Sequence, residues 1–308
     1  MSMRWPDGKR FAFSIFDDPD AQTVAEGRSV YSFLADLGFL TTRGVWPLGA
    51  TREVNSPGET CANPEYLAHN LELQKLGFEM GYHNATPHSV AREETRQALD
   101  LFKSYFGHDP RAMANHYNRD AIYWGSARLT GGLARAVYGV STLGRNDSRF
   151  RGEVEGEPEF WGDLCRERIE YCRNFVYADI DTLAVCPWMP YHDPLRPFVR
   201  KWYSAADGAN IKNYIRMLSE SNQDRLEEQG GACIMYTHFG HGYVRDGHLH
   251  ARFKALMTRL SQKNGWFVPV STLLDYLRQQ RDRIDITDLE RQSLERRWLW
   301  EKMFRGTS

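Results

Sequence analysis

Residues 73–94, LQKLGFEMGYHNATPHSVAREE, contain one complete passage from helix to strand to helix. A helical segment ends in the first residues, the run 78–83 is strand-like, and a second helix begins near Ser89. His83 closes the strand and His88 opens that helix. We therefore expect two imidazoles on either side of a short polar turn, at the point where a strand passes into the helix that follows it.

Strand-like and helix-like segments alternate in the same way along the rest of the chain. The expected strands are residues 10–16, 43–48, 78–83, 111–117, 175–180, 183–189, 232–240 and 266–270. Segments with helical spacing separate most of them. Repeated strand–helix units favour either a parallel barrel or an open α/β sheet, formed by residues 1–284 as a single domain.

Two segments stand apart from this alternation. Residues 144–172 are irregular and rich in Gly, Arg and Glu, and we expect an insertion there. The tail 285–308 is expected to pack on the main domain as an extension. Its pattern is compatible with a helix or with a pair of strands.

The composition of the 308 residues is that of an ordinary soluble globular protein, with 42% hydrophobic and 26% charged residues. A formal net charge of −1 provides no long-range field for nucleic acid or an anionic membrane. The first residues lack a signal-peptide pattern, no apolar run is long enough to span a bilayer, and the five cysteines are scattered. We expect a cytoplasmic protein with reduced thiols, no nucleic-acid partner and no membrane span.

Polar side chains collect where the expected strands end. They are Asp17, Asp18, His83, His88, Asn115, His116, Asp179, Asp181, His238 and His241. In a parallel α/β architecture the carboxyl ends of the strands gather on one face, which is where active sites form. We expect these residues to contribute to one site.

The residue types suggest metal-assisted chemistry. Imidazoles and a carboxylate are the usual ligands of zinc, and three protein ligands leave a position open for water. Of the neighbouring Asp17 and Asp18, one can bind a metal while the other acts as a general base, and His238 can act as a general acid. Taken singly, however, paired aspartates also form turns or caps, and two histidines near a helix start can simply be solvated.

Three segments together resemble the ordered motifs of the polysaccharide deacetylase family, also called NodB-homology domains. They are FAFSIFDD (11–18), LGFEMGYHNATPHS (76–89) and IMYTHFGH (234–241). The resemblance runs from about Arg10 to Leu277 and implies a distorted (β/α) barrel with about seven parallel strands. It also implies a hydrolase acting on carbon–nitrogen bonds other than peptide bonds.

Carried over to this chain, the motifs imply Asp17 as the catalytic base and His238 as the general acid. They imply that Asp18, His83 and His88 bind a divalent metal ion, which is expected to be zinc.

The chain departs from the family's pattern in several places, and two of them concern the expected site. Four residues separate His83 from His88, where family members usually have three. The family's third motif carries an arginine that orients the catalytic aspartate, and here Asn115 or His116 stands in its place.

Further residues near the strand ends are expected to bind the substrate. They are Asn115, His116, Asp181, Trp188, Tyr191 and His241. Aromatic rings can stack on a sugar, although Trp188 and Tyr191 could equally be ordinary core or loop residues. The expected substrate is a carbohydrate or another small acylated molecule, and the sequence carries no sign of the oligomeric state.

Three functions remain open. The first is a metal-dependent hydrolase that removes an acetyl or similar acyl group from an amino sugar or glycan precursor. The second is a metal-free amide or cyclic-imide hydrolase of the same fold, and the third is a carbohydrate-binding descendant without catalysis. The retention of Asp17, Asp18, His83, His88 and His238 argues against the third.

Overall fold

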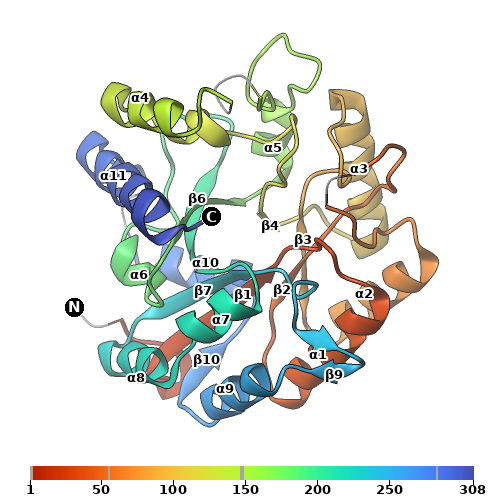
Figure 1. Cartoon of the computed structure of the whole chain (residues 1–308), viewed down its shortest axis with the longest axis vertical. Coiled ribbons are helices and arrows are strands. Elements are labelled where there is room, and N and C mark those ends of the chain that lie inside the picture. The colour runs from red at the N-terminus through yellow and green to blue at the C-terminus, as the bar shows by residue number, and fades with distance from the viewer. Residues whose placement is uncertain (1–2, 55, 146–148, 282–283) are drawn as a thin grey trace.

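The strands form a closed parallel barrel in the computed structural model, which describes residues 3–54, 56–145, 149–281 and 284–308. Seven strands follow one another around the barrel, and the seventh pairs with the first (Figure 1). They are β1 (Phe11–Asp17), β2 (Thr42–Val45), β3 (Glu79–Tyr82), β4 (Ala112–Met113), β5 (Tyr171–Tyr177), β6 (Lys201–Gly208) and β7 (Ala232–Thr237). An additional strand, β10 (Gly265–Phe267), pairs with the first half of β1. The expected barrel of about seven parallel strands is confirmed.

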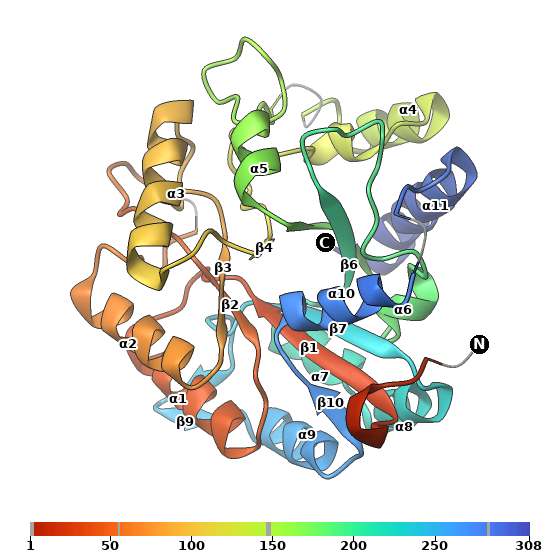
Figure 2. The ribbon, with the colours of Figure 1, turned by 180° about the vertical axis from the view of Figure 1, so that it is seen from behind.

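Helices lie around these strands, as the views from both sides show (Figures 1 and 2). Those between β1 and β5 are α1 (Val24–Asp36), α2 (Pro64–Lys75), α3 (Arg92–Phe106), η2 (Gly125–Arg128), α4 (Gly132–Ser141) and α5 (Gly162–Arg168). Those after β5 are α6 (Thr182–Val185), α7 (Ile211–Met217), α8 (Glu220–Gln229), α9 (Ala251–Ser261), α10 (Val270–Gln279) and α11 (Asp288–Arg305). A short turn η1 (Pro6–Gly8) precedes β1, and a hairpin of β8 (Val244–Arg245) and β9 (His248–Leu249) precedes α9. None of the described helices is long and apolar enough to cross a membrane.

The strand β1 lies at the centre of the fold because it pairs with β2, β7 and β10. All seven of its residues are buried, as expected for a parallel strand covered on both faces. Its register with β7 runs from Ala12 opposite Ala232 to Asp17 opposite Thr237. The segments that follow β1 and β7 therefore leave the barrel at the same end, where the polar residues of both are brought together.

One expected strand does not form, and one strand of the barrel was not expected. Residues 183–189 do not form a strand, because Asp181 caps a short helix there: its side chain accepts a hydrogen bond from the backbone N–H of Ala184. The neighbouring strand β6 was not expected from its sequence, KWYSAADG, which lacks a continuous apolar run. All eight of its residues are nevertheless buried, because the strand lies inside the sheet, paired with β5 on one side and β7 on the other.

The C-terminal tail, for which the sequence allowed a helix or a strand pair, forms the helix α11. Its N-terminus is closed by a capping box in which Thr287 and Glu290 bond each other's backbone N–H groups. Trp298 packs against Phe175 of β5 and Tyr138 of α4, with ring centroids 5.3 and 5.6 Å apart. In both views α4 and α11 lie side by side on one flank of the barrel (Figures 1 and 2).

Candidate active site

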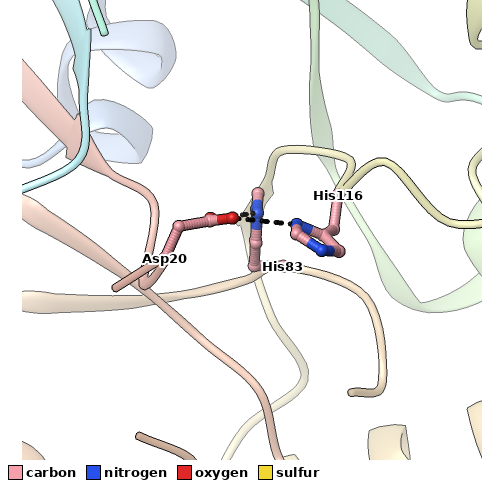
Figure 3. A group of neighbouring side chains, drawn as sticks. All are labelled: Asp20, His83 and His116. Atoms are coloured by element: carbon pink, nitrogen blue, oxygen red, sulfur yellow. Dashed lines mark ion pairs between the residues drawn. The ribbon is translucent and has the colours of Figure 1, made fainter. Parts of the chain in front are cut away.

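Three side chains from three separate loops meet at the carboxyl end of the barrel (Figure 3). Asp20 follows β1, His83 directly follows β3, and His116 follows β4. Oδ2 of Asp20 lies 3.3 Å from Nε2 of His83, and Oδ1 of Asp20 lies 3.3 Å from Nδ1 of His116. All three side chains are buried, and one ligand atom from each falls within 4.8 Å of the others. We call this group the Asp20–His83–His116 cluster.

The cluster has the residue types of a metal site, and two of its potential ligand atoms lack a hydrogen-bond partner. Oδ2 of Asp20 and Nδ1 of His83 are buried without a hydrogen-bond partner among the described residues. Burial alone would raise the pKa of Asp20, but the rings of His83 and His116 hold that pKa well below its usual range. Burial lowers the pKa of His116 to about 4, so its imidazole is neutral at physiological pH. Two imidazoles and a carboxylate could hold zinc or a similar divalent ion.

Asn84 fixes the two histidine loops relative to each other. Its backbone adopts the left-handed conformation, with φ of 61°, which asparagine tolerates better than most residues. The side-chain Oδ1 accepts a hydrogen bond of 2.8 Å from the backbone N–H of His116, while Nδ2 donates one of 2.7 Å to Asp120. Asn84 therefore connects the loop that carries His83 with the loop that carries His116.

Asp18 lies beside the cluster and is held by an arginine from across the barrel. Arg173, in the middle of β5, donates two hydrogen bonds of 3.0 and 2.6 Å to the two carboxylate oxygens. Both side chains are only 2% exposed. Oδ1 of Asp18 also lies 3.7 Å from Nδ1 of His83. The bidentate pair fixes the orientation of the carboxylate next to the cluster.

Asp17 points the other way, as alternation along a strand requires for adjacent residues. Its carboxylate accepts hydrogen bonds from the hydroxyl of Tyr31 (2.8 Å), the amide of Gln22 (3.0 Å) and the backbone N–H of Phe239 (2.8 Å). Burial raises the pKa of Asp17 to about 6. These contacts attach β1 to α1 and to the segment after β7, on the side away from the cluster.

His238 faces the cluster from the end of β7. Its Nδ1 lies 2.7 Å from the carbonyl oxygen of Ala209, which can only accept, so Nδ1 carries the hydrogen. Nε2 is then the nitrogen that can take up or release a proton. It lies 3.7 Å from Oδ2 of Asp20, 3.9 Å from Oδ2 of Asp18 and 3.3 Å from the hydroxyl of Tyr236.

These groups line one cavity of about 400 Å³. Its inner wall contains Asp18, Asp20, His83, His116 and His238. The cavity therefore brings together a potential metal site, a carboxylate held in place by an arginine, and an imidazole that can exchange a proton. Such an arrangement can activate water and protonate a leaving group.

The structure places His88 in the cavity wall but outside the cluster. Its Nε2 accepts a hydrogen bond of 3.0 Å from the backbone N–H of Thr51, and Nδ1 lies 3.1 Å from the carbonyl oxygen of Ser89. Both ring nitrogens are thus engaged by the protein. Asn115, which also lines the cavity, uses its amide to bond both backbone groups of Ile122 and so shapes the loop.

The other four residues that were expected to bind substrate do not line this cavity. Asp181 accepts a hydrogen bond from the backbone of Ala232, the first residue of β7, and so lies toward the opposite end of that strand from His238. Tyr191 is buried against Asn174, and Trp188 packs against the core. The exposed His241 stacks on the ring of His238, with centroids 4.9 Å apart.

Asp20 and Arg173 were not among the residues expected from the sequence, although both had a local signal. Asp20 is the third aspartate in the run FDDPD (16–20), two residues beyond Asp18. Arg173 interrupts the apolar run of β5, which begins at Tyr171, earlier than the expected strand at 175–180. A charged residue inside a buried strand indicates a partner across the barrel, but the sequence does not name that partner.

Comparison with known proteins supports the fold. No protein-family model and no curated protein sequence gives a significant match. A solved structure of a putative polysaccharide deacetylase from Mycobacterium smegmatis superposes with a TM-score of 0.54 at 12% identity, over 93% of this chain and 96% of that one. A family 4 acetyl xylan esterase from Clostridium thermocellum, solved with a cobalt ion, gives 0.43 at 11% identity, over 89% and 98%. The fold expected from the resemblance to polysaccharide deacetylases is confirmed by the first of these.

Proposed function

We propose that this chain is a metal-dependent hydrolase that removes an acetyl or similar acyl group from an amino sugar or a glycan precursor. The observation that carries the proposal is the content of the cavity at the carboxyl end of the barrel. There the Asp20–His83–His116 cluster is flanked by Asp18 on one side and His238 on the other.

The proposed metal ligands are Asp20, His83 and His116, and the proposed ion is zinc or a similar divalent cation. Asp18 and His88, two of the three ligands expected from the sequence, are less suitable. The carboxylate of Asp18 is already neutralised by Arg173, and both ring nitrogens of His88 are engaged by the backbone. An ion bound by the cluster would polarise the acyl carbonyl and make a water molecule more acidic.

Asp18 is the proposed general base. Arg173 holds its carboxylate in place, and one of its oxygens lies within 4 Å of the cluster. Asp17, the base expected from the sequence, does not line the cavity, because its carboxylate faces Tyr31, Gln22 and Phe239 on the other side of β1. Asp18 would take a proton from the attacking water as the oxygen bonds to the carbonyl carbon.

His238 is the proposed general acid. With Nδ1 bonded to Ala209, the protonated ring carries its second hydrogen on Nε2, on the side that faces the two carboxylates. That hydrogen would pass to the nitrogen of the substrate as the carbon–nitrogen bond breaks. The products are a free amine and the carboxylic acid, and the water molecule supplies the oxygen that the acid gains.

The test combines metal content with acid release from acetylated amino sugars. We expect about one equivalent of metal in the wild type, a loss of that metal in Asp20→Asn and His116→Ala, and its retention in His88→Ala. Asp18→Asn should keep the metal and lose turnover, whereas Asp17→Asn should keep both.

Each of the other outcomes selects a different function or a different set of residues. Acid release that persists after chelation would identify a metal-free amide hydrolase. Sugar binding without acid release would identify a non-catalytic carbohydrate-binding protein. A metal that is lost in His88→Ala and retained in His116→Ala would return the site to the residues expected from the sequence.

A further inference from the structure

The cavity contains a buried arginine whose charge is not used by the proposed reaction. Arg128, the last residue of η2, lines the cavity and is 3% exposed. Its guanidinium carbon lies 3.2 Å from the centre of the Trp124 ring and 5.2 Å from that of Trp298. The two indoles hold the planar guanidinium in position through cation–π contacts, without supplying a counter-charge.

No carboxylate of the described residues lies within 4.0 Å of the Arg128 guanidinium, and its Nε and Nη2 are buried without a hydrogen-bond partner. Other buried arginines are paired: Arg173 with Asp18, and Arg196 and Arg291 with Asp193. An isolated buried charge is costly, so a ligand that supplies a negative group would stabilise it.

Arg43 is a useful contrast, since it is also buried between aromatic rings without an ion pair among the described residues. It lies over Tyr31 and Tyr66 and donates a hydrogen bond to Gln22. Arg43 does not line the cavity, however, so no ligand there could reach it. Arg128 differs because the residue lines the cavity of the proposed active site.

Two other cations, Arg173 and Lys302, interact electrostatically with Arg128. Burial, assisted by the positive charge of Arg173, lowers the pKa of Arg128 to about 9. Burial and the charge of Arg128 likewise lower the pKa of Lys302, on α11, to about 8. Burial is the main cause of both shifts, and the negative charge of Asp207 partly offsets the shift of Lys302.

We propose that Arg128 forms a subsite for a negatively charged group on the substrate, either a carboxylate or a phosphate, so that the hydrolase acts on an acidic acylated sugar. The planar fork of a guanidinium binds either group through two parallel hydrogen bonds. Such a group would satisfy the donors of Arg128 and hold the acyl group toward Asp18 and His238, which line the same cavity. The acidic substrate class rests on the proposed hydrolase function, whereas the anion subsite itself does not.

Anion binding is measured first, because it needs no turnover. The full chain is titrated with sodium glucuronate, inorganic phosphate and neutral glucose at constant ionic strength, with tryptophan fluorescence and thermal shift as readouts. Because anions also bind metals, each titration is repeated after chelation. We expect saturable binding of glucuronate or phosphate that survives chelation, and none of glucose.

Arg128→Met should weaken that binding by at least about tenfold, because two charge-assisted hydrogen bonds are lost. Arg128→Lys keeps the charge but not the two parallel donors, so its anion affinity should lie between those of the wild type and Arg128→Met. It replaces Arg128→Met in the test if the methionine variant fails to fold. Arg43→Met is the matched control, with the same change in a similar aromatic setting outside the cavity, and should bind as the wild type does. Equal binding of glucose and glucuronate by the wild type, or undiminished binding by folded Arg128 variants, would overturn the subsite.

Acid release then tests the substrate class. N-acetylated amino sugars bearing a carboxylate or a phosphate are compared with neutral N-acetylglucosamine. The wild type should favour an acidic sugar by about tenfold or more in kcat/KM, and Arg128→Met should abolish that preference. Anion binding without acid release from any sugar would reject the hydrolase and keep the subsite. Equal turnover of neutral and acidic sugars would reject the acidic substrate and keep the hydrolase.

Discussion

Removing the guanidinium of Arg173 should destabilise the protein strongly, because Asp18 would remain buried without its counter-charge. Both side chains of this pair are 2% exposed, and two hydrogen bonds of 3.0 and 2.6 Å join them. Removal of one partner of such a buried pair costs about 3–5 kcal/mol. With a urea slope of about 3 kcal/mol per molar for a chain of this size, Arg173→Met should lower the unfolding midpoint by about 1 M or more.

Arg111→Met is the matched control for that measurement. Arg111 also binds an aspartate, Asp275, through two hydrogen bonds of 2.8 Å, but the two side chains are 46% and 31% exposed. Solvent screening limits the contribution of such a pair to the free energy of unfolding to about 0–1 kcal/mol. Urea unfolding is followed by circular dichroism with a chelator present, so that bound metal adds no stability.

A double variant identifies the origin of the stability lost in Arg173→Met. If the unpaired carboxylate is the cause, Arg173→Met combined with Asp18→Asn should be more stable than Arg173→Met alone. The gain should be about 2 kcal/mol, since a buried neutral amide costs less than a buried charge. The reasoning is refuted if Arg173→Met costs no more than Arg111→Met, or if the double variant regains nothing.

Three further predictions concern single residues. Burial raises the pKa of Asp17 to about 6, above about 3.9 in the unfolded chain, so the folded state binds the proton more tightly. Its contribution to the free energy of unfolding should therefore fall by about 3 kcal/mol as the pH rises from about 3 to about 7, and unfolding curves of Asp17→Asn across that range should lack this decline. Asn84→Gly should weaken metal binding about 10–100-fold, because glycine tolerates the left-handed backbone but loses the hydrogen bond to the His116 loop. Competition with a chromophoric chelator measures the metal affinity, and an unchanged affinity would contradict this prediction. His238→Gln should lower kcat by about 10²–10⁴-fold at unchanged metal content, and near-normal turnover of acetylated sugars would exclude His238 as the acid.

Local patterns in the sequence were sufficient for most of the barrel. Strands such as β1 and β7 are apolar runs that can be recognised one by one, and parallel strands joined by helices have few ways to pack. β6 escaped prediction because its burial comes from packing by neighbouring elements and not from an apolar run of its own. Residues 183–189 were mistaken for a strand because the capping by Asp181 outweighs the apolar character of the segment.

The sequence by itself determined that His83 and His238 stand at the carboxyl ends of their strands. His83 and His238 were predicted there because each directly follows an apolar run, and the structure places both beside the same carboxylates. Their position follows from chain connectivity alone, since the residue after a parallel strand must lie at that end of the barrel.

Only the tertiary structure decided which of these residues meet. The pairing of Asp18 with Arg173 joins residues 155 positions apart, and it exists because closure of the barrel brings β5 opposite the end of β1. The same closure places His116 next to Asp20, while local backbone groups engage the ring nitrogens of His88. Competition for hydrogen bonds and distances across a closed barrel are properties of the folded chain, and no spacing along the sequence encodes them.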